Sequence, residues 1–393
     1  MVRPCPMKYF LVLGCFFWCA AVISQFASIM VALFRLSQRG TNFAEHGEGV
    51  SVIRPLCGIE NFIEDTLRST FKLDYPCYEI IFCVADDHDP VISVVERLIK
   101  ANHTISARLL IGNHPISANP KLNNLVKGWR AARYDWILMT DSNVLMPTDH
   151  LQRMLSAWRH DTGLVCSPPV GAAPSNFWAE LECAFLNTYQ ARWQSFADGI
   201  GLGFAQGKAM LWRRELLDRA GGIEVLGSEI AEDAAATKAI RGLGLRVRMV
   251  GRPFAQPLGY RGMAEVWHRQ LRWARLRRTT FKLFFIPELL TGAVTPLALT
   301  VAIAIAAGWP IAALVAPLLA AWYAAEALLA HRAGWQWSPL SIPAWMLRDA
   351  LLPVLWVCAW LGNEFEWRGN AMSVADDDAL LPFELAPQST GTE

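Results

Sequence analysis

The sequence predicts an α/β domain with a mixed, largely parallel sheet, held between membrane helices at its two ends. Short apolar segments alternate with helical ones, which is the pattern of βαβ units. Apolar residues are also concentrated at both ends of the chain, and 53% of all residues are hydrophobic. The mean hydropathy of +0.24 and the 17 tryptophans are high for a soluble enzyme. The 393 residues can hold one sizeable domain plus membrane helices.

Residues 1–38 are expected to form a transmembrane anchor. No charged residue lies between Tyr9 and Phe34, a stretch long enough to cross a hydrocarbon core of about 30 Å. The alternative is a cleaved signal peptide. That would have an apolar core of only ~7–15 residues, followed by a cleavage site of small residues, and neither is evident.

Residues 286–365 are expected to form C-terminal membrane helices, with spans near 286–308, 311–330 and 341–361. Between Leu283 and Gly362 the charged residues are few: Glu288, Glu326, Arg332, Arg348 and Asp349. Several prolines indicate kinked or re-entrant pieces, which membranes tolerate where protein satisfies the freed backbone groups. The alternative is a buried helical core.

The catalytic domain is expected at 45–265, beginning with strands near 49–55 and 78–85. A helix over 91–101 and a strand over 107–111 follow. A helix over 122–133 then leads to a strand over 136–140. Acidic residues follow two of these strands, and ligands of open α/β sheets bind outside the carboxyl ends of the strands.

The first acidic group is Asp86, Asp87 and Asp89, directly after a strand. Asp86 and Asp87 are candidates for substrate binding. The alternative is a solvated turn, and Asp89-Pro90 has the form of a helix start. Which of the three takes a functional role is left open.

Asp141-Ser142-Asn143 follows the strand over 136–140. A carboxylate near another oxygen ligand suits Mg²⁺ or Mn²⁺ bridging a diphosphate, so Asp141 and Asn143 are the candidate metal ligands. The alternative is that these residues only close a turn. Lys121 lies just inside a helix start, where it could neutralise the same diphosphate or simply face solvent.

Glu232 and Asp233 precede a helical stretch over 235–241, where acidic residues are common for dipole reasons. Asp233 is the candidate general base that takes a proton from an acceptor hydroxyl. Glu232 is assigned to substrate binding. The Gly-rich stretch 199–208 lacks Walker spacing and is interpreted as a flexible loop on the acceptor side.

An interfacial basic helix is expected over 266–285, next to the membrane. Arg275, Arg277 and Arg278 have the character of a juxtamembrane patch that holds anionic headgroups. Arg269 and Arg272 are three residues apart and share a helix face, so they could stabilise a departing diphosphate. Trp273 offers a flat apolar surface to an acceptor or sugar.

Charge and cysteine content add three expectations. The net charge of +1 implies no nucleic-acid partner. The nine cysteines form no CxxC pair or regular framework and are expected to be reduced. Basic residues after the first span and before the next place the domain on the cytoplasmic side.

The tail, 366–393, is expected to be disordered from Asp376 onward.

Together these residues resemble a lipid-directed glycosyltransferase of the GT-A type, and above all the ceramide glucosyltransferase family with its bacterial hopanoid-glycosylating relatives. The resemblance covers roughly 50–282 and the flanking membrane segments. It is carried by Arg269-x-x-Arg272-Trp273, by Glu232-Asp233, by Asp141-Ser142-Asn143, by the Asn-Pro-Lys segment around Lys121, and by Glu366-Trp367-Arg368-Gly369.

The resemblance implies transfer of glucose from UDP-glucose to ceramide with inversion, on the cytosolic face of a bacterial inner membrane or a Golgi-type membrane. The alternatives are transfer of N-acetylglucosamine to a hopanoid or of hexose to diacylglycerol. A non-catalytic membrane scaffold or lipid transporter is the alternative of another class. The resemblance also returns Arg368 to the cytosolic site. Three full spans after Phe281 would place it on the wrong side, so either one of the proline-marked segments is re-entrant or the count of spans is wrong by one.

Overall fold

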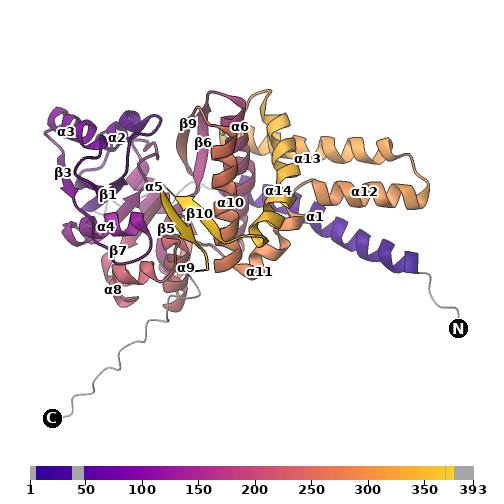
Figure 1. Ribbon diagram of the computed structural model, residues 1–393, viewed down its shortest axis with the longest axis horizontal. Coiled ribbons are helices and arrows are strands. Elements are labelled where there is room, and N and C mark those ends of the chain that lie inside the picture. The colour runs from indigo at the N-terminus through magenta and orange to yellow at the C-terminus, as the bar shows by residue number, and fades with distance from the viewer. Residues whose placement is uncertain (1–5, 38–47, 368, 376–393) are drawn as a thin grey trace, which may run out of the picture.

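The computed structural model describes residues 6–37, 48–367 and 369–375. The expected disordered tail from Asp376, and Arg368, lie outside these residues. The described chain forms an α/β domain from which a group of long helices projects to one side (Figure 1).

A seven-stranded sheet lies at the centre of the domain, in the order β3-β2-β1-β4-β7-β5-β8. Its strands are β1 (Val50–Leu56), β2 (Tyr78–Val84), β3 (Ser106–Ile111), β4 (Trp136–Thr140), β5 (Thr162–Ser167), β7 (Ala209–Arg213) and β8 (Arg246–Met249). The strands from β3 to β4 are parallel, as are β5 and β8, whereas β7 runs antiparallel to both β4 and β5. The predicted mixed, largely parallel sheet is confirmed.

The two faces of this sheet are each covered by a hydrophobic core. Side chains of a strand point alternately to opposite faces. Val52 therefore packs in one core and Ile53 in the other, and both are fully buried. The helices of the domain's first half are α2 (Ile63–Thr70), α3 (Val91–Ala101), α4 (Pro120–Ala131) and α5 (His150–Ser156). Later in the chain come α8 (Arg214–Arg219), the short 3₁₀ helix η2 (Ile223–Gly227) and α9 (Glu232–Gly242).

A second layer stands between this sheet and the membrane helices. It contains the parallel pair β6 (Pro169–Pro174) and β9 (Phe254–Gly259). It also contains one long helical segment, made of α6 (Phe177–Phe185), the π-helical turn η1 (Leu186–Ala191) and α7 (Arg192–Gly199). The basic helix α10 (Met263–Thr280) lies beside them and continues into α11 (Lys282–Phe285) and η3 (Ile286–Leu290).

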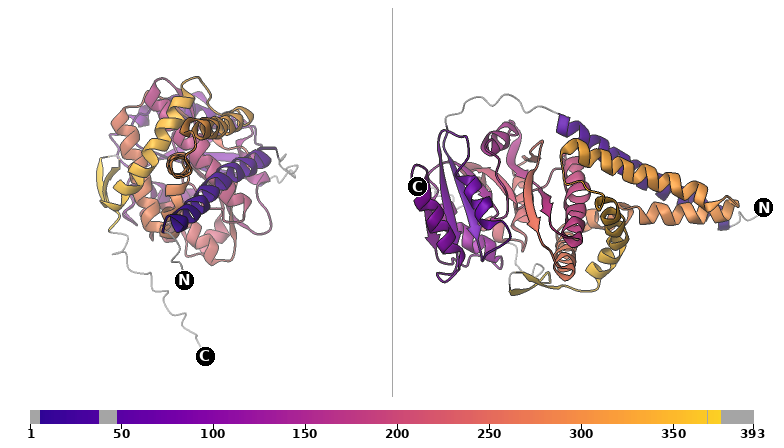
Figure 2. Two further views of the ribbon diagram at one scale, coloured as in Figure 1. Left: turned by 90° about the vertical axis from the view of Figure 1, so that its right-hand side faces the viewer. Right: turned by 90° about the horizontal axis from the view of Figure 1, so that it is seen from above.

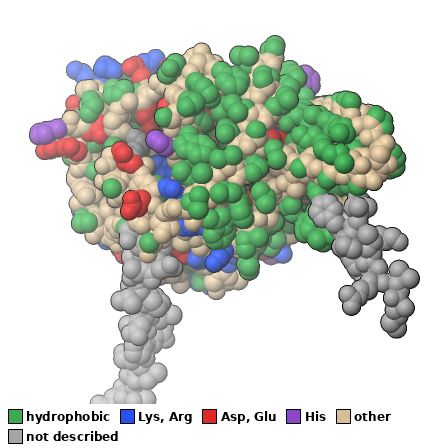
Figure 3. Space-filling model, turned by 45° about the vertical axis from the view of Figure 1, so that its right-hand side comes forward, with side chains coloured by type: hydrophobic (Ala, Val, Ile, Leu, Met, Phe, Trp, Pro, Cys, Tyr) green, Lys and Arg blue, Asp and Glu red, His purple; other side chains and the backbone are tan. Residues whose placement is uncertain are grey.

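Three helices project together from the domain: α1 (Pro6–Ser37), α12 (Val294–Ala307) and α13 (Ile311–Ala333). Figures 1 and 2 show the start of α1 and the turn between α12 and α13 at the same far end. Side chains such as Ile23, Met30 and Ile305 are exposed. Hydrophobic side chains dominate this part of the surface in Figure 3, and charged ones gather at the opposite end.

The fourth long helix, α14 (Ser341–Trp360), is arranged differently. By length and composition alone it could cross a membrane, as could α1 and α13, and a bent pair of shorter helices over Lys282–Leu290 and Val294–Ala307 forms a further candidate. Figure 1 shows α14 running across the base of the projecting group, alongside α10, and packed on the domain. The helices α12 and α13 form a hairpin that leaves the domain and returns to it, and the number of segments that cross a membrane stays a prediction.

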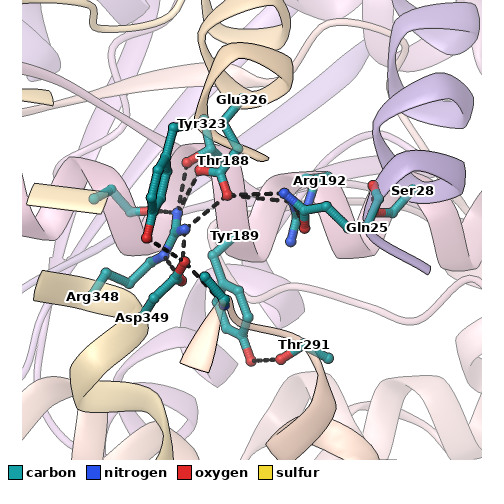
Figure 4. A network of polar contacts seen from close by, with 12 residues as sticks. Gln25, Ser28, Thr188, Tyr189, Arg192, Thr291, Tyr323, Glu326, Arg348 and Asp349 are labelled. Carbon is teal, nitrogen blue, oxygen red and sulfur yellow. Dashed lines mark hydrogen bonds and ion pairs between the residues drawn. The ribbon is translucent and has the colours of Figure 1, made fainter. Parts of the chain in front are cut away.

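A buried set of charged side chains joins the projecting helices to the domain, which we call the junction cluster (Figure 4). Arg348 of α14 donates two hydrogen bonds of 2.9 Å to Glu326 of α13, and it also bonds its neighbour Asp349 at 2.8 Å. Arg192 of α7 donates to Gln25 of α1 at 2.5 Å, and Gln25 in turn donates to Glu326 at 3.2 Å. The cluster therefore ties four helices together.

The chain after α14 forms a small antiparallel hairpin of β10 (Glu364–Trp367) and β11 (Asn370–Ser373). The hairpin crosses the expected boundary at 365–366. It contacts α10, whose Arg275 side chain hydrogen-bonds the backbone carbonyl of Glu364.

Candidate active site

The candidate site lies at the carboxyl end of β4. Asp141 is the first residue after this strand. The antiparallel strand β7 begins at Ala209, which pairs with Thr140. The N–H of Asp141 donates to the carbonyl of Lys208 at 2.9 Å, so the strand pairing itself sets Lys208 beside Asp141.

Two lysines and three acids meet there, and we call Lys121, Asp141, Lys208, Glu232 and Asp233 the site cluster. The Lys121 ammonium lies 2.7 Å from Asp141 Oδ1 and 2.6 Å from Glu232 Oε1. The Lys208 ammonium lies 2.9 Å from Asp141 Oδ2. The structure thus brings together Lys121, Asp141, Glu232 and Asp233, which were predicted separately from distant parts of the sequence.

The starts of α4 and α9 converge at this cluster. Asn119 caps α4, because its side-chain oxygen accepts the N–H of Lys121 at 2.9 Å. Its amide nitrogen donates to Glu232 Oε2 at 2.8 Å and to the carbonyl of Ile230 at 3.0 Å. One asparagine therefore fixes the start of one helix against the start of the other.

Gly207 lies in the middle of the cluster and has to be small. Its N–H donates to Asp233 Oδ2 at 3.0 Å, and its carbonyl accepts from Lys121 Nζ at 2.7 Å. A Cβ at this position would lie 2.7 Å from Glu232 Oε1 and 3.1 Å from Lys121 Nζ. The Gly-rich stretch 199–208 thus ends as a fixed part of the site, which departs from the flexible loop that the sequence suggested.

Asp233 is half-buried at the first turn of α9. Burial, and then the negative charge of Glu232, raise the pKa of Asp233 to about 6. A carboxylate with a pKa in this range can both exist ionised at neutral pH and accept a proton, as a general base must.

Asp141 and Lys121 are held in their charged forms. Burial opposes ionisation of Asp141, but Lys121 and Lys208 together hold its pKa well below its usual range. Burial likewise opposes the charge on Lys121, and the attraction of Asp141 and Glu232 outweighs it, so the pKa of Lys121 is raised. These two residues carry fixed charge and are unsuited to proton transfer near neutral pH.

Arg54 supports the turn that carries Asp141, and the sequence analysis did not single it out. It is fully buried in β1, and its guanidinium donates to the carbonyls of Asp141, Ser142 and Val144 at 2.8, 2.9 and 3.0 Å. The arginine thereby fixes the backbone on which Asp141 is placed.

The first acidic group lies at the end of β2, on the other side of β1 from Asp141. Asp86, Asp87 and His88 are exposed, and their ligand atoms lie within 4.8 Å of one another. Asp89 has a structural role, since it accepts the N–H of Val91 at 2.9 Å and that of Gly58 at 2.8 Å. Two strand spacings, about 10 Å, separate the ends of β2 and β4, a gap that a nucleotide can bridge.

The residues at Asp141 do not fit the predicted divalent metal in this geometry. Lys121 and Lys208 contact one Asp141 oxygen each, and Lys208 also donates to Asn143 Oδ1 at 3.1 Å. Two ammonium groups thus occupy the positions around the expected ligands, and like charges at such distances repel a cation strongly. Asp86, Asp87 and His88 offer a separate group of candidate ligand atoms at the end of β2.

Arg269 of the arginine–tryptophan motif is engaged in a structural ion pair. It contacts Glu182 of α6, a fully buried carboxylate, and Glu265 of its own helix at 3.0 Å. Arg261 lies 3.3 Å from the same Glu182. These contacts explain the position of Arg269 by packing of α10 on α6.

Arg272 and Trp273 point to different surroundings. The Arg272 guanidinium lies over the ring of Trp367 in the β10–β11 hairpin, 5.4 Å from the ring centre. Trp273 is partly buried and packs against the hydrophobic cluster that contains Leu258. Arg272 therefore connects the basic helix to the C-terminal hairpin. The catalytic roles of Arg269, Arg272 and Trp273 stay predictions.

Lys208 is the residue of the site cluster that the sequence analysis missed. The short strand β7 follows the Gly-rich stretch and gave no strand signal of its own. Its antiparallel insertion beside β4 places Lys208 next to Asp141. The available signal was a lysine at the end of a Gly-rich stretch and directly before a buried apolar run.

Comparison with known sequences gives matches over most of the chain. The family described as "Glycosyl transferase family 21" matches residues 16–380. Ceramide glucosyltransferase 1 of Caenorhabditis elegans is 26% identical over 369 residues, covering 92% of this chain and 79% of the relative. The ceramide glucosyltransferase of Komagataella phaffii is 43% identical over 114 residues, covering 28% of this chain and 22% of the relative.

Comparison with solved structures places the fold. A mannosyltransferase from Pyrobaculum calidifontis, in complex with GDP-Man and Mn²⁺, superimposes with a TM-score of 0.51 at 19% sequence identity. The match covers 88% of this chain and 97% of that protein. The likeness establishes a shared GT-A fold.

Proposed function

Because the chain belongs to glycosyl transferase family 21, we propose that it transfers glucose from UDP-glucose to ceramide with inversion at the anomeric carbon. Family membership makes the protein a glycosyltransferase of the ceramide glucosyltransferase family with a GT-A fold. The sugar, the acceptor lipid and the stereochemical course are the proposed part.

The observation that carries the proposal is the site cluster. It combines fixed positive charge, from Lys121 and Lys208, with a carboxylate of raised pKa, Asp233, at the edge of the sheet where ligands of such folds bind. A sugar transfer from a nucleotide donor requires both features. The positive charge stabilises the departing diphosphate, and the carboxylate activates the acceptor.

In the proposed reaction Asp233 is the general base. The acceptor hydroxyl oxygen attacks the anomeric carbon, the bond from this carbon to the diphosphate oxygen breaks, and its electrons leave with UDP. The hydroxyl proton passes to the Asp233 carboxylate. Gly207 supports this role, because its N–H holds one Asp233 oxygen in position.

The departing diphosphate is assigned to the lysines. Lys121 and Lys208 flank Asp141, which keeps them in place while ionised. Asp86 and Asp87, at the end of β2, are assigned to the nucleotide half of the donor, across β1 from Asp141. We route no step through a metal at Asp141 and Asn143, since lysines occupy the oxygens of both.

We further propose that the domain lies on the cytosolic side, with ceramide arriving from the bilayer. Arg275 and Arg278 lie at the domain end of the projecting helices, and basic residues favour the cytosolic side. The flat placement of α14 supports this topology, because the α12–α13 hairpin returns the chain to the side of the domain.

The test is a panel of radiolabelled UDP-sugars, including UDP-glucose and UDP-N-acetylglucosamine, assayed with the full chain in lipid nanodiscs. Ceramide, a hopanoid and diacylglycerol are supplied one at a time. We expect labelled glucose on ceramide, with the product's anomeric configuration opposite to that of the donor.

Other outcomes separate the alternatives. Label on the hopanoid or on diacylglycerol would replace ceramide as the acceptor while keeping the chemistry. Retained configuration would exclude a single displacement with Asp233 as base. Absence of UDP release with every pair would leave a non-catalytic scaffold or lipid transporter as the better account.

A further inference from the structure

The Lys208 ammonium occupies the position that a divalent cation bound by Asp141 and Asn143 would take. Its Nζ lies 2.9 Å from Asp141 Oδ2 and 3.1 Å from Asn143 Oδ1. These are the residues whose oxygens the sequence predicts as metal ligands. The Lys208 ammonium, with one positive charge, therefore lies where a divalent cation would otherwise bind.

The other lysine of the cluster has no hydrogen left to offer. An ammonium group has three N–H donors. Those of Lys121 face Asp141 Oδ1 at 2.7 Å, Glu232 Oε1 at 2.6 Å and the Gly207 carbonyl at 2.7 Å. The hydrogens of Lys121 thus hold two carboxylates and the end of the Gly-rich stretch together, and Lys121 acts on the diphosphate through its charge without a direct hydrogen bond.

Lys208 differs because its two acceptors, Asp141 and Asn143, account for two of its three N–H donors within the described part of the chain. Its side chain is 17% exposed, so solvent or a ligand can reach it. Its backbone is fixed as well, since its carbonyl accepts from the Asp141 N–H at 2.9 Å and from Thr140 Oγ1 at 3.1 Å. The Lys208 ammonium is therefore held in position with one N–H directed at no protein acceptor in the described residues, and it can bind an anionic oxygen.

We propose that Lys208 binds the diphosphate of the nucleotide-sugar donor in place of a divalent cation, so that donor binding requires no metal at Asp141. This inference builds on the proposed function, because it takes the donor to be a nucleoside diphosphate sugar. Lysine binds phosphate as a compact point charge. Asp141 then orients Lys208 and makes no contact with a metal.

The same geometry predicts how the site changes when Lys208 is removed. Replacing Lys208 by an uncharged residue would leave Asp141 Oδ2 and Asn143 Oδ1 side by side without the ammonium between them. Two such oxygens are ligands that Mg²⁺ and Mn²⁺ accept. Because Lys121 remains on the other Asp141 oxygen, the substitution should let a divalent cation support donor binding in part.

The experiment measures UDP affinity by calorimetry, with the full chain in nanodiscs, in EDTA and again with Mn²⁺. For the wild type we expect dissociation constants that agree within about threefold. Lys208→Met should weaken UDP binding about 10- to 100-fold in EDTA, as expected for a lost hydrogen bond to a charged group. Added Mn²⁺ should restore part of this loss.

Two variants serve as controls. Lys208→Arg keeps the charge and should retain binding in EDTA, which keeps the test decisive if the methionine variant fails to fold. Lys100→Met removes an exposed lysine on α3 and should change nothing.

Loss of wild-type UDP binding in EDTA would overturn the proposal, and so would an unchanged affinity of Lys208→Met. Failure of the wild type to bind UDP in either buffer would reject UDP as the donor, and with it this role of Lys208. The UDP-sugar panel separates the two failures. If transfer from UDP-glucose persists, the proposed function stands and only the role of Lys208 is wrong; if no transfer from UDP-glucose is found, the proposed function is wrong as well.

Discussion

The molecule contains two clusters of charged side chains that are alike in composition and opposite in setting. The site cluster and the junction cluster each combine two cations with acidic partners. In the junction cluster the side chains of Glu326, Arg348 and Asp349 are at most 2% exposed. In the site cluster those of Asp141 and Lys208 are 17–19% exposed.

This difference separates structural charge from functional charge. Arg348 faces two carboxylates and the Thr188 hydroxyl, and its contacts come from helices that must be packed for the cluster to exist. Lys208 has a remaining donor and Asp233 has a raised pKa, so the site cluster can exchange partners with a ligand. Substitutions should therefore affect folding in one cluster and chemistry in the other.

The largest effect is expected for Asp233→Asn, which removes the proposed base and keeps the shape of the side chain. Transfer should fall about 10²- to 10⁴-fold, the usual contribution of a general base. UDP affinity should stay within about threefold. Both are measured on the full chain in nanodiscs, by product formation and by calorimetry.

Asp218→Asn, at an exposed carboxylate on α8, is the matched control and should leave both quantities unchanged. If Asp233→Asn lost UDP binding together with transfer, Asp233 would be a binding residue, and the contrast between the clusters would weaken.

The next effect concerns stability. Arg348→Met removes the cation that bonds both Glu326 and Asp349 and leaves Glu326 with Arg192 at 3.6 Å. Loss of one partner of a buried ion pair typically costs about 3 to 5 kcal/mol. We expect a lower unfolding temperature and a poor yield of folded protein in detergent. Both are measured by fluorescence-detected size-exclusion chromatography. The fraction that folds should bind UDP normally.

Arg332→Met, at an exposed arginine near the end of α13, controls for loss of positive charge from the same region. Normal stability of Arg348→Met would show that the junction cluster adds nothing to folding. In that case its burial alone could not be used to distinguish it from the site cluster.

The smallest effect is a pH-dependent gain in stability. The pKa of Asp233 is raised in the folded state to about 6 from an ordinary value of 3.8. Its stabilising contribution is therefore complete below pH 3.8 and is lost as the pH rises through about 6. Asp233→Asn should unfold at a higher temperature than the wild type above pH 6, and this advantage should shrink as the pH falls towards 4. An advantage that is the same at every pH would argue against the raised pKa.

Much of the fold followed from local sequence patterns. The strands β1, β2 and β4 carry apolar, β-branched residues, and acidic residues directly after two of them placed the edge of the sheet that binds ligands. The helices α1, α12 and α13 were predicted from long apolar stretches that contain few charged residues. The resemblance to ceramide glucosyltransferases, based on a few short motifs, is confirmed by the match to glycosyl transferase family 21.

What escaped prediction depended on pairing between distant segments. Lys208 reaches Asp141 only because β7 inserts antiparallel beside β4, a contact across 67 positions that no local pattern reveals. The ion pair of Arg269 with the buried Glu182, 87 positions away, was also not visible in the sequence, and the expected role of Arg269 at the leaving group stays a prediction. Likewise, hydropathy predicts α14 as a candidate span, and its packing against α6 and α10, across the base of the projecting helices, could not be read from the sequence.

The length of α12 has a consequence for the surrounding lipid. Its 14 residues rise about 21 Å, less than the ~30 Å of an average hydrocarbon layer. Tilting, the preceding bent segment or the bilayer itself has to make up the difference. Wherever the bilayer does so, it becomes thinner around α12, at a modest cost in free energy for each ångström of mismatch.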